Sequence, residues 1–345
     1  LTGAGVIHQH GIGEGCSGSG VQPVDGSEAI KSLESDNRPT SSEKRSRDPQ
    51  QLIDTLRSEH CRVLKRIPKA SRSLAANKFA TLLAKIVLTP DDVTTWADLM
   101  RFSFTCFAVP GGRGGRRHLS SLTSKVNKTL EAYPSMNRAQ SPSTNVQSRK
   151  QRTKSANNIA ARVSEKLEEG DVKGAIRLAA SADTLAPNNE QTFEALRLKH
   201  PPRAVTNNGP PSFSQLNSSI RPLLVHERDV TDAIKSFPVG SAGGLDGLRP
   251  QHLKDMTSVQ TGEAGQRLIT TLTDFANLCL AGKVPESIRP VFCGASLCAL
   301  SKKGGGIRPI AVGCTLRRLV AKAATKLVQE RIVLAPTQLG FGVKQ

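Results

Sequence analysis

The sequence predicts a mostly α-helical protein with one small α+β region near its C-terminal end. Apolar residues recur at three- and four-residue spacing in much of the chain after residue 50, which is the spacing of helices with one buried face. A different pattern surrounds Gly304-Gly305-Gly306: two short runs rich in Leu, Ile and Val flank the glycines, which is typical of a tight β-hairpin. Residues 1–50 are dense in Gly, Ser, Asp, Glu and Pro. We expect them to form a disordered tail because they cannot bury enough apolar surface.

The first predicted folded region, residues 51–134, is helical and basic. Three helices are expected, at residues 52–67, 71–88 and 93–107. The third places Val93, Trp96, Met100 and Phe104 on one face. Core packing explains this aromatic stripe better than base stacking does.

The charge of the chain indicates a polyanionic partner. Its net charge is +19 and its pI is about 10.0, so nucleic acid is the first candidate and a membrane surface the second. The excess is strongest in residues 101–154, which hold eleven Lys or Arg and a single acid. There Arg113, Arg116 and Arg117 lie on a glycine-rich loop, which suits contacts to backbone phosphates more than to bases. A solubilising loop is the alternative.

The sequence predicts no metal site and no disulfide framework. Its seven cysteines are an odd number without a C-x-x-C pair, so we interpret them as buried thiols. His8-x-His10 with Cys16 lacks the spacing of zinc ligands and is assigned to the solvated tail. The pair Asp91-Asp92 follows Thr89-Pro90, which is typical of a helix start where acids favour the helix dipole.

No signal for a membrane or for secretion is recognisable. The chain has no apolar run of the roughly 18 residues that a spanning helix needs, and no signal peptide stands at its N-terminus. We therefore expect a soluble intracellular protein, in the nucleus or the cytoplasm, that is not secreted and has no membrane partner.

The middle of the chain is predicted to hold a smaller helical region, residues 155–200, between two linkers. The linkers are expected at residues 135–154, rich in Ser, Asn, Gln and Arg, and at residues 201–222, which contain Pro210-Pro211. Three short helices are expected between them, at about residues 156–169, 172–182 and 189–200.

The last region, residues 223–345, combines helices with the hairpin. A helix at residues 228–237 stops at Pro238, Pro250 begins the next helix after a glycine-rich loop, and a longer helix ends at Gly282. The buried faces of the longer and the final helix are expected to be Leu268, Leu272, Phe275 and Cys279, and Leu316, Leu319, Val320, Ala323 and Leu327.

The final helix also carries a basic stripe. Arg318, Lys322 and Lys326 lie four residues apart, so that a cation recurs at every turn. Such a row is suited to following a nucleic-acid backbone. An exposed face made of ordinary helix formers is the alternative.

The hairpin tip is a candidate nucleotide site. Lys302 and Lys303 precede the glycine turn and Arg308 follows it, so three cations gather there. Glycines let a backbone approach phosphate closely, and guanidinium and ammonium groups donate charge-assisted hydrogen bonds to its oxygens. A triphosphate would suit this tip, whereas the plain alternative is a solvated hairpin end.

Four elements in order resemble the fingers region of the reverse transcriptases of non-LTR (LINE-type) retrotransposons. The matching segments are Gly244-Leu245-Asp246-Gly247, the basic hairpin with Arg308-Pro309-Ile310, the helix from Cys314 to Lys322, and Gln338-Leu339-Gly340-Phe341-Gly342. The resemblance is strong over about residues 220–345 and weaker back to about residue 50. It implies that Lys302, Lys303 and Arg308 contact the incoming deoxynucleoside triphosphate, and that RNA and DNA are the macromolecular partners.

The resemblance also implies which parts of that family's chemistry to expect here. The family catalyses two-metal phosphoryl transfer, with Mg²⁺ held by palm aspartates that follow the Gln-Leu-Gly-Phe-Gly segment. Because the sequence runs from Leu1 to Gln345, we expect the N-terminal and fingers portion of an RNA-directed DNA polymerase, inactive alone, with no catalytic residue and no cofactor of its own. Mg²⁺ is expected only for the complete parent polymerase.

The glycine-rich loop is assigned a structural role. Gly243, Gly244, Asp246 and Gly247 are expected to shape it, because an Asp between glycines readily forms local side-chain to backbone hydrogen bonds. A non-enzymatic, basic nucleic-acid-binding protein derived from such an element is the alternative function. A P-loop nucleotidase is excluded because no G-x-x-x-x-G-K-[S/T] motif is present.

Overall fold

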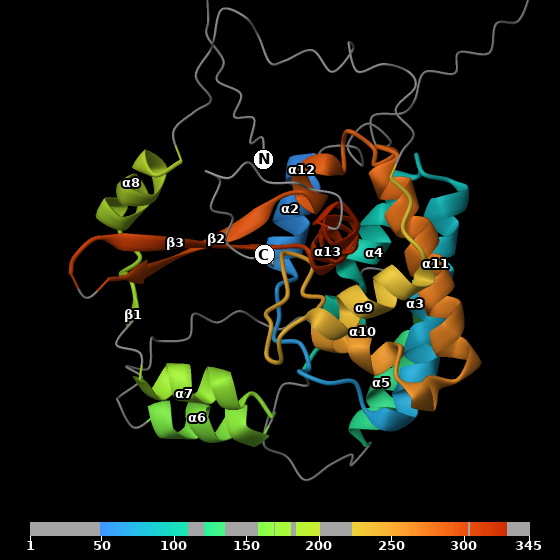
Figure 1. The fold of residues 1–345 in the computed structure, drawn as a ribbon, viewed down its shortest axis with the longest axis horizontal. Coiled ribbons are helices and arrows are strands. Elements are labelled where there is room, and N and C mark those ends of the chain that lie inside the picture. The colour runs from blue at the N-terminus through green and yellow to red at the C-terminus, as the bar shows by residue number, and fades with distance from the viewer. Residues whose placement is uncertain are drawn as a thin grey trace, which may run out of the picture.

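The computed structural model describes residues 49–109, 121–134, 158–168, 170–180, 184–200, 223–302 and 304–329. Most of these residues are helical, and three strands form one small antiparallel sheet. Figure 1 shows a body of packed helices from which the strands β2 and β3 extend as an arm. The predicted fold class, mostly helical with a small α+β region, is confirmed at this level. The predicted tail, both linkers and the Gln338–Gly342 segment lie almost entirely outside the described residues.

The N-terminal part of the body consists of helices that the apolar spacing largely predicts. They are α2 (Pro49–Ser58), the short 3-10 turn η1 (Lys69–Ser71), α3 (Arg72–Leu88), α4 (Val93–Cys106) and α5 (Leu122–Ala132). Asp92 begins α4 by accepting a hydrogen bond from the Thr94 amide at 3.0 Å. A hydrogen bond from the Thr95 hydroxyl holds the pKa of Asp92 below its usual range. The acid therefore lies at a helix start, as the sequence suggests, but the cap is Asp92 itself, whereas the predicted cap residue Thr89 follows the end of α3.

The prediction that the first helix continues to Ile67 is wrong. Helix α2 ends at Ser58, and the chain then runs extended beside the segment that follows α4. The Leu64 amide donates to the Phe107 carbonyl at 2.8 Å, and the Val109 amide donates to the Arg62 carbonyl at 2.7 Å. Pairing with a distant segment has overridden the local helical pattern. Helix α5, which the sequence analysis does not predict, lies in the same part of the chain.

The predicted helices and hairpin of the middle and C-terminal regions occur in the predicted order. The elements of these regions are α6 (Asn158–Glu168), α7 (Val172–Ala180), β1 (Thr184–Leu185), α8 (Glu190–Leu198), α9 (Glu227–Ser236), α10 (Pro250–Met256), the 3-10 turn η4 (Val259–Thr261), α11 (Glu263–Leu280), α12 (Arg289–Phe292), β2 (Ala295–Ser301), β3 (Ile307–Gly313) and α13 (Thr315–Gln329). Of these, β1, η4 and α12 are additional elements that the sequence analysis does not predict. Gly282 ends α11 with a φ of 75°. The Lys283 amide bonds to the Leu278 carbonyl and the Gly282 amide to the Cys279 carbonyl, which is the expected glycine cap.

One continuous core joins the N-terminal helices to the last region of the chain. Helix α3 packs along α11 in the body (Figure 1). Trp96 of α4 is fully buried, with ring centroids 5.4 Å from Phe275 and 5.7 Å from Phe292. The predicted stripe on α4 is therefore mostly core, as are the apolar faces of α11 and α13. The described residues of 51–109 and 121–134 and those of 223–302 and 304–329 thus bury their apolar surface against each other.

The interpretation of all cysteines as buried thiols is wrong for two of them. Cys106 and Cys314 are buried and Cys61 and Cys279 are half-buried, but Cys293 and Cys298 are exposed. Cys298 lies on β2, most of which is exposed because the strand belongs to the arm rather than the body. All six of these thiols are free.

Within the described ranges, no helix combines the length and the apolar character that crossing a bilayer requires.

Candidate nucleotide and nucleic-acid interface

The predicted hairpin is formed by β2 and β3. Their register pairs Ser301 with Ile307 at the tip and Ala295 with Gly313 at the base. The Lys302 amide donates to the Gly306 carbonyl at 3.1 Å, which closes the turn. Gly305 and Gly306 have φ values of 86° and 77°, a region that glycine occupies at little cost. The glycine run therefore supplies the backbone shape that the tight turn requires.

Two of the three predicted nucleotide contacts share one face of the hairpin. Arg308 pairs in register with Leu300, and cross-strand partners point to the same side. Lys302 follows Leu300 by two residues, so alternation along the strand places it on that side as well. Both side chains are exposed, at the end of the arm that lies farthest from the helical body (Figure 1). Lys303 lies outside the described residues.

Pro309 restricts the positions that β3 can occupy in the sheet to an edge. The strand order is β1-β2-β3, so β3 is an edge strand of the described sheet, as a residue without an N–H requires. Pro309 faces Ala299, whose carbonyl accepts a hydrogen bond from the Ala186 amide next to β1 at 3.0 Å. The proline ring limits the backbone beside Arg308, which gives the guanidinium a comparatively rigid base.

The glycine-rich loop between α9 and α10 is packed too closely for side chains. A Cβ atom on Gly244 would lie 2.5 Å from the Gly313 carbonyl oxygen at the end of β3, and one on Gly243 would lie 2.8 Å from the Leu248 carbonyl oxygen. Gly247 has a φ of 68°, and a Cβ there would lie 2.5 Å from Phe104 Cε1. The loop therefore contacts both the base of the hairpin and the body.

Asp246 fastens this loop to the start of α13. It is buried, and its Oδ2 accepts a hydrogen bond from Cys314 Sγ at 3.2 Å, while Oδ1 has no hydrogen-bond partner among the described residues. Thr315 Oγ1 donates to the Leu248 carbonyl at 2.5 Å beside it. Burial raises the pKa of Asp246 to about 6, against the opposing effects of the Cys314 thiol, the nearby amides of Asp246 and Leu248, and the charge of Arg318.

The basic stripe on α13 faces α9 and the loop. Arg318 donates to the Ala242 carbonyl at 2.6 Å, Lys322 donates to Ser236 Oγ at 3.1 Å, and Lys326 pairs with Asp232 at 2.7 Å. Arg318 and Lys322 also stand over the Phe237 ring, at 5.7 and 5.2 Å from its centroid. Each cation thus has a partner within the protein. Nucleic-acid binding by this stripe stays a prediction, as does binding by Arg113, Arg116 and Arg117, which lie outside the described residues.

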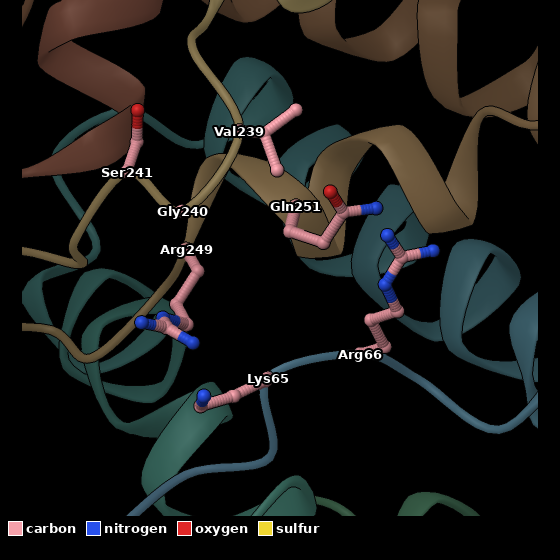
Figure 2. Close-up of a pocket in the computed structure, with 7 residues that line it drawn as sticks. All are labelled: Lys65, Arg66, Val239, Gly240, Ser241, Arg249 and Gln251. Carbon is pink, nitrogen blue, oxygen red and sulfur yellow. The ribbon is translucent and has the colours of Figure 1, made fainter. Parts of the chain in front are cut away.

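A basic pocket that the sequence analysis missed lies where α10 meets the segment after α2. Its lining residues are Lys65, Arg66, Val239, Gly240, Ser241, Arg249 and Gln251 (Figure 2). More than 170 positions separate Arg66 from Val239 in the sequence, so no linear pattern could have joined the cations. In the described part of the chain, no group of three or more His, Cys, Asp and Glu side chains is arranged to hold a metal ion.

Replacing Asp246 by asparagine is expected to stabilise the fold at neutral pH by about 3 kcal/mol, since the pKa rises from 3.8 to about 6 and about 1.4 kcal/mol corresponds to each unit of pKa shift. A raised pKa means that the folded state holds the proton more tightly than the unfolded chain does. Ionisation therefore costs stability above the folded pKa of about 6, and this cost disappears as the pH falls below the ordinary value of 3.8. Asparagine cannot ionise and still offers an oxygen to Cys314.

Urea denaturation of both proteins at pH 7.5 and pH 4 measures this effect. The gain in unfolding free energy should be present at pH 7.5 and shrink toward pH 4. Buried His252, whose pKa is lowered to about 4, weakens both proteins alike as the pH falls below 6.5, so its contribution cancels in the comparison. A gain of the same size at both pH values would show that Asp246 ionisation is not its cause.

A scan of protein-family models, a search of curated proteins and a search of solved structures each found no match to this chain. The case for a function therefore rests on the hairpin, the loop and the distribution of charge.

Proposed function

We propose that residues 223–345 are the fingers portion of a non-LTR retrotransposon reverse transcriptase, which contacts the template and the incoming nucleotide. One observation carries this proposal: the end of β3, where the hairpin leads into α13, packs against a Gly-x-Asp-Gly loop and is hydrogen-bonded to it. Arg308 and Lys302 share one exposed face of that hairpin, and the loop meets its base through Gly244 and Asp246. RNA, DNA and a deoxynucleoside triphosphate are the proposed partners, and Mg²⁺ is the proposed cofactor of the complete parent polymerase.

The chemistry of the arm suits a triphosphate. The Arg308 guanidinium can offer two N–H groups to two oxygens of one phosphate, whereas Lys302 acts as a mobile point charge. A short glycine turn keeps the tip narrow, so a phosphate chain can approach both the side chains and the backbone. The loop and α13 hold the base of the arm, so that the tip is carried by two packed elements rather than by a single linker.

The second candidate is a non-enzymatic protein that binds nucleic acid through charge. The net charge of +19 favours it, because a strongly basic surface attracts any polyanion. The two candidates differ at the hairpin: the fingers proposal requires a triphosphate contact at Arg308, whereas binding through charge alone does not.

Both candidates require nucleic-acid binding that depends steeply on salt. We expect the full chain to bind single-stranded RNA and duplex DNA without sequence preference, with log affinity falling linearly against log salt concentration because bound phosphates release counterions. Fluorescence anisotropy with labelled 20-nucleotide strands at 50–300 mM KCl measures the slope. A variant with Arg113, Arg116 and Arg117 replaced by alanine should have a shallower slope.

An unchanged slope in that triple variant would remove the loop from the binding surface. Absence of binding by the full chain at the lowest salt concentration would contradict the proposed function in both forms.

A further inference from the structure

We propose that the basic pocket formed by Lys65, Arg66 and Arg249 binds one backbone phosphate of a nucleic-acid strand. This inference rests on the proposed function and adds to it a site that is separate from the hairpin tip. Three cations and no carboxylate are among the residues that line the pocket. In Figure 2 the Lys65 and Arg249 side chains reach toward the open space between the segment after α2 and the loop before α10.

The backbone that carries Lys65 and Arg66 is held firmly to α10. His252 Nε2 lies 2.7 Å from the Leu64 carbonyl oxygen, and Asp255 Oδ2 accepts a hydrogen bond from the Ile67 amide at 2.8 Å. His252 and Asp255 are both buried. The two cationic residues are therefore placed between two buried anchor points, which sets them apart from lysines and arginines on a mobile surface loop.

The same histidine fixes the other side of the pocket. The Arg249 amide donates to His252 Nδ1 at 3.2 Å, so that Nε2 carries the proton and donates to Leu64. Burial lowers the pKa of His252 to about 4, so the ring is neutral at physiological pH and keeps this pair of hydrogen bonds. One buried ring thus sets the spacing between Arg249 and the backbone of Lys65, although 184 positions separate these residues in the sequence.

Among the described residues, three acidic groups lie near the pocket: Glu165 on α6, Asp171 between α6 and α7, and Asp255 on α10. Asp255 accepts a hydrogen bond from the lining residue Gln251 at 3.1 Å and pairs with Arg72 at 2.9 Å. Glu165 pairs with Lys65 at 2.7 Å, with both side chains partly exposed, and Asp171 pairs with Lys166 near Gly240. Arg249 forms no ion pair within the described part of the chain. A phosphate entering the pocket would therefore meet Arg249 directly, and would compete with Glu165 for Lys65.

The shape of the pocket favours a single phosphate. It is an open, shallow site, since its empty space of about 270 Å³ includes open solvent, whereas sites that bury a whole small molecule are clefts or cavities of roughly 300–1,000 Å³. A phosphate that projects from a strand on the surface needs much less space. Gly240, Ser241 and Arg249 flank the Gly243–Gly247 loop that contacts the base of the hairpin, so a strand held here is connected to the hairpin through one short segment.

The test compares charge-neutralising variants in the full chain. Arg249→Gln and Arg66→Gln each remove one cation from the pocket, and Arg267→Gln removes one from an exposed position on α11. With labelled single-stranded RNA at 100 mM KCl, we expect each pocket variant to bind roughly tenfold more weakly and to lose about 0.7 from the log–log salt slope, the value of one phosphate contact on a single strand. Arg267→Gln should match the wild type. Circular dichroism melting checks that every variant is folded.

A strand in which neutral methylphosphonates replace part of the phosphates tests the contact without requiring a fixed register. It should weaken binding to the wild type more than it weakens binding to Arg249→Gln, which has already lost the pocket contact. If the wild type binds with a steep salt slope while folded Arg249→Gln and Arg66→Gln are indistinguishable from Arg267→Gln, the pocket is not a phosphate site. If Arg249→Gln does not fold, Arg66→Gln alone decides. Failure of the wild type to bind any strand would instead overturn the proposed function on which this inference rests.

Discussion

Replacing Arg308 by alanine is expected to weaken binding of a deoxynucleoside triphosphate by roughly tenfold to a hundredfold, because a hydrogen bond to a charged group contributes about 1.5–3 kcal/mol. Arg308 is exposed on the edge strand β3, next to Pro309 and on the same face as Lys302. The full chain, a fluorescent deoxynucleoside triphosphate and Mg²⁺ are sufficient to measure the dissociation constant.

The control variants separate geometry from charge. Arg308→Lys keeps the charge but loses the bidentate hydrogen bond to phosphate, so its affinity for the triphosphate should lie between those of the wild type and the alanine variant. Lys302→Ala should have a smaller effect than Arg308→Ala, because a lysine is a mobile point charge. Affinity for RNA should change little in all three variants. If Arg308→Ala binds the triphosphate normally but binds RNA more weakly, then Arg308 contacts the RNA strand rather than the triphosphate, and the role proposed for the hairpin tip is wrong.

Local patterns in the sequence predict most of the fold. Apolar spacing identifies α3, α4, α11 and α13 because each buries a single face, and Gly282 marks the end of α11 because its positive φ is a local property. The hairpin is equally local, since its turn and both strands lie within residues 295–313. Signals of this kind do not depend on what the rest of the chain does.

Features that arise from contacts between distant segments could not be predicted. The stretch after Ser58 has a helical pattern, yet it runs extended because the Leu64 amide pairs with the Phe107 carbonyl. Cys298 looks like a core residue but lies on an arm outside the body. The basic pocket requires His252 to bind Leu64 across 188 positions. No spacing rule along the chain reports such contacts.

The basic stripe on α13 shows that the prediction of binding residues from the sequence has the same limit. Arg318, Lys322 and Lys326 are correctly placed along one side of a helix, but the sequence could not show that this side faces α9. Lys326 pairs with Asp232, and Arg318 is fastened to the Ala242 carbonyl in the loop. The spacing of charges establishes that they are aligned, whereas their partners depend on how the helices pack.

The proposal that residues 220–345 form the fingers subdomain of a reverse transcriptase is tested most directly by joining them to the palm subdomain of a related enzyme. We expect a chimera in which residues 220–345 precede the palm and thumb of a LINE-type reverse transcriptase to extend a primer on an RNA template with Mg²⁺. The full chain alone should extend none, since we assign it no catalytic residue. The donor enzyme with its own fingers rejoined at the same junction is the positive control.

The decisive comparison is primer extension by this chimera and by its Gly244→Ala and Arg308→Ala variants. We predict extension by the chimera, loss of extension in Gly244→Ala because a Cβ there would lie 2.5 Å from the Gly313 carbonyl oxygen, and a raised nucleotide requirement in Arg308→Ala. A folded chimera that binds the template and primer but extends nothing, beside an active positive control, would contradict the proposed fingers role.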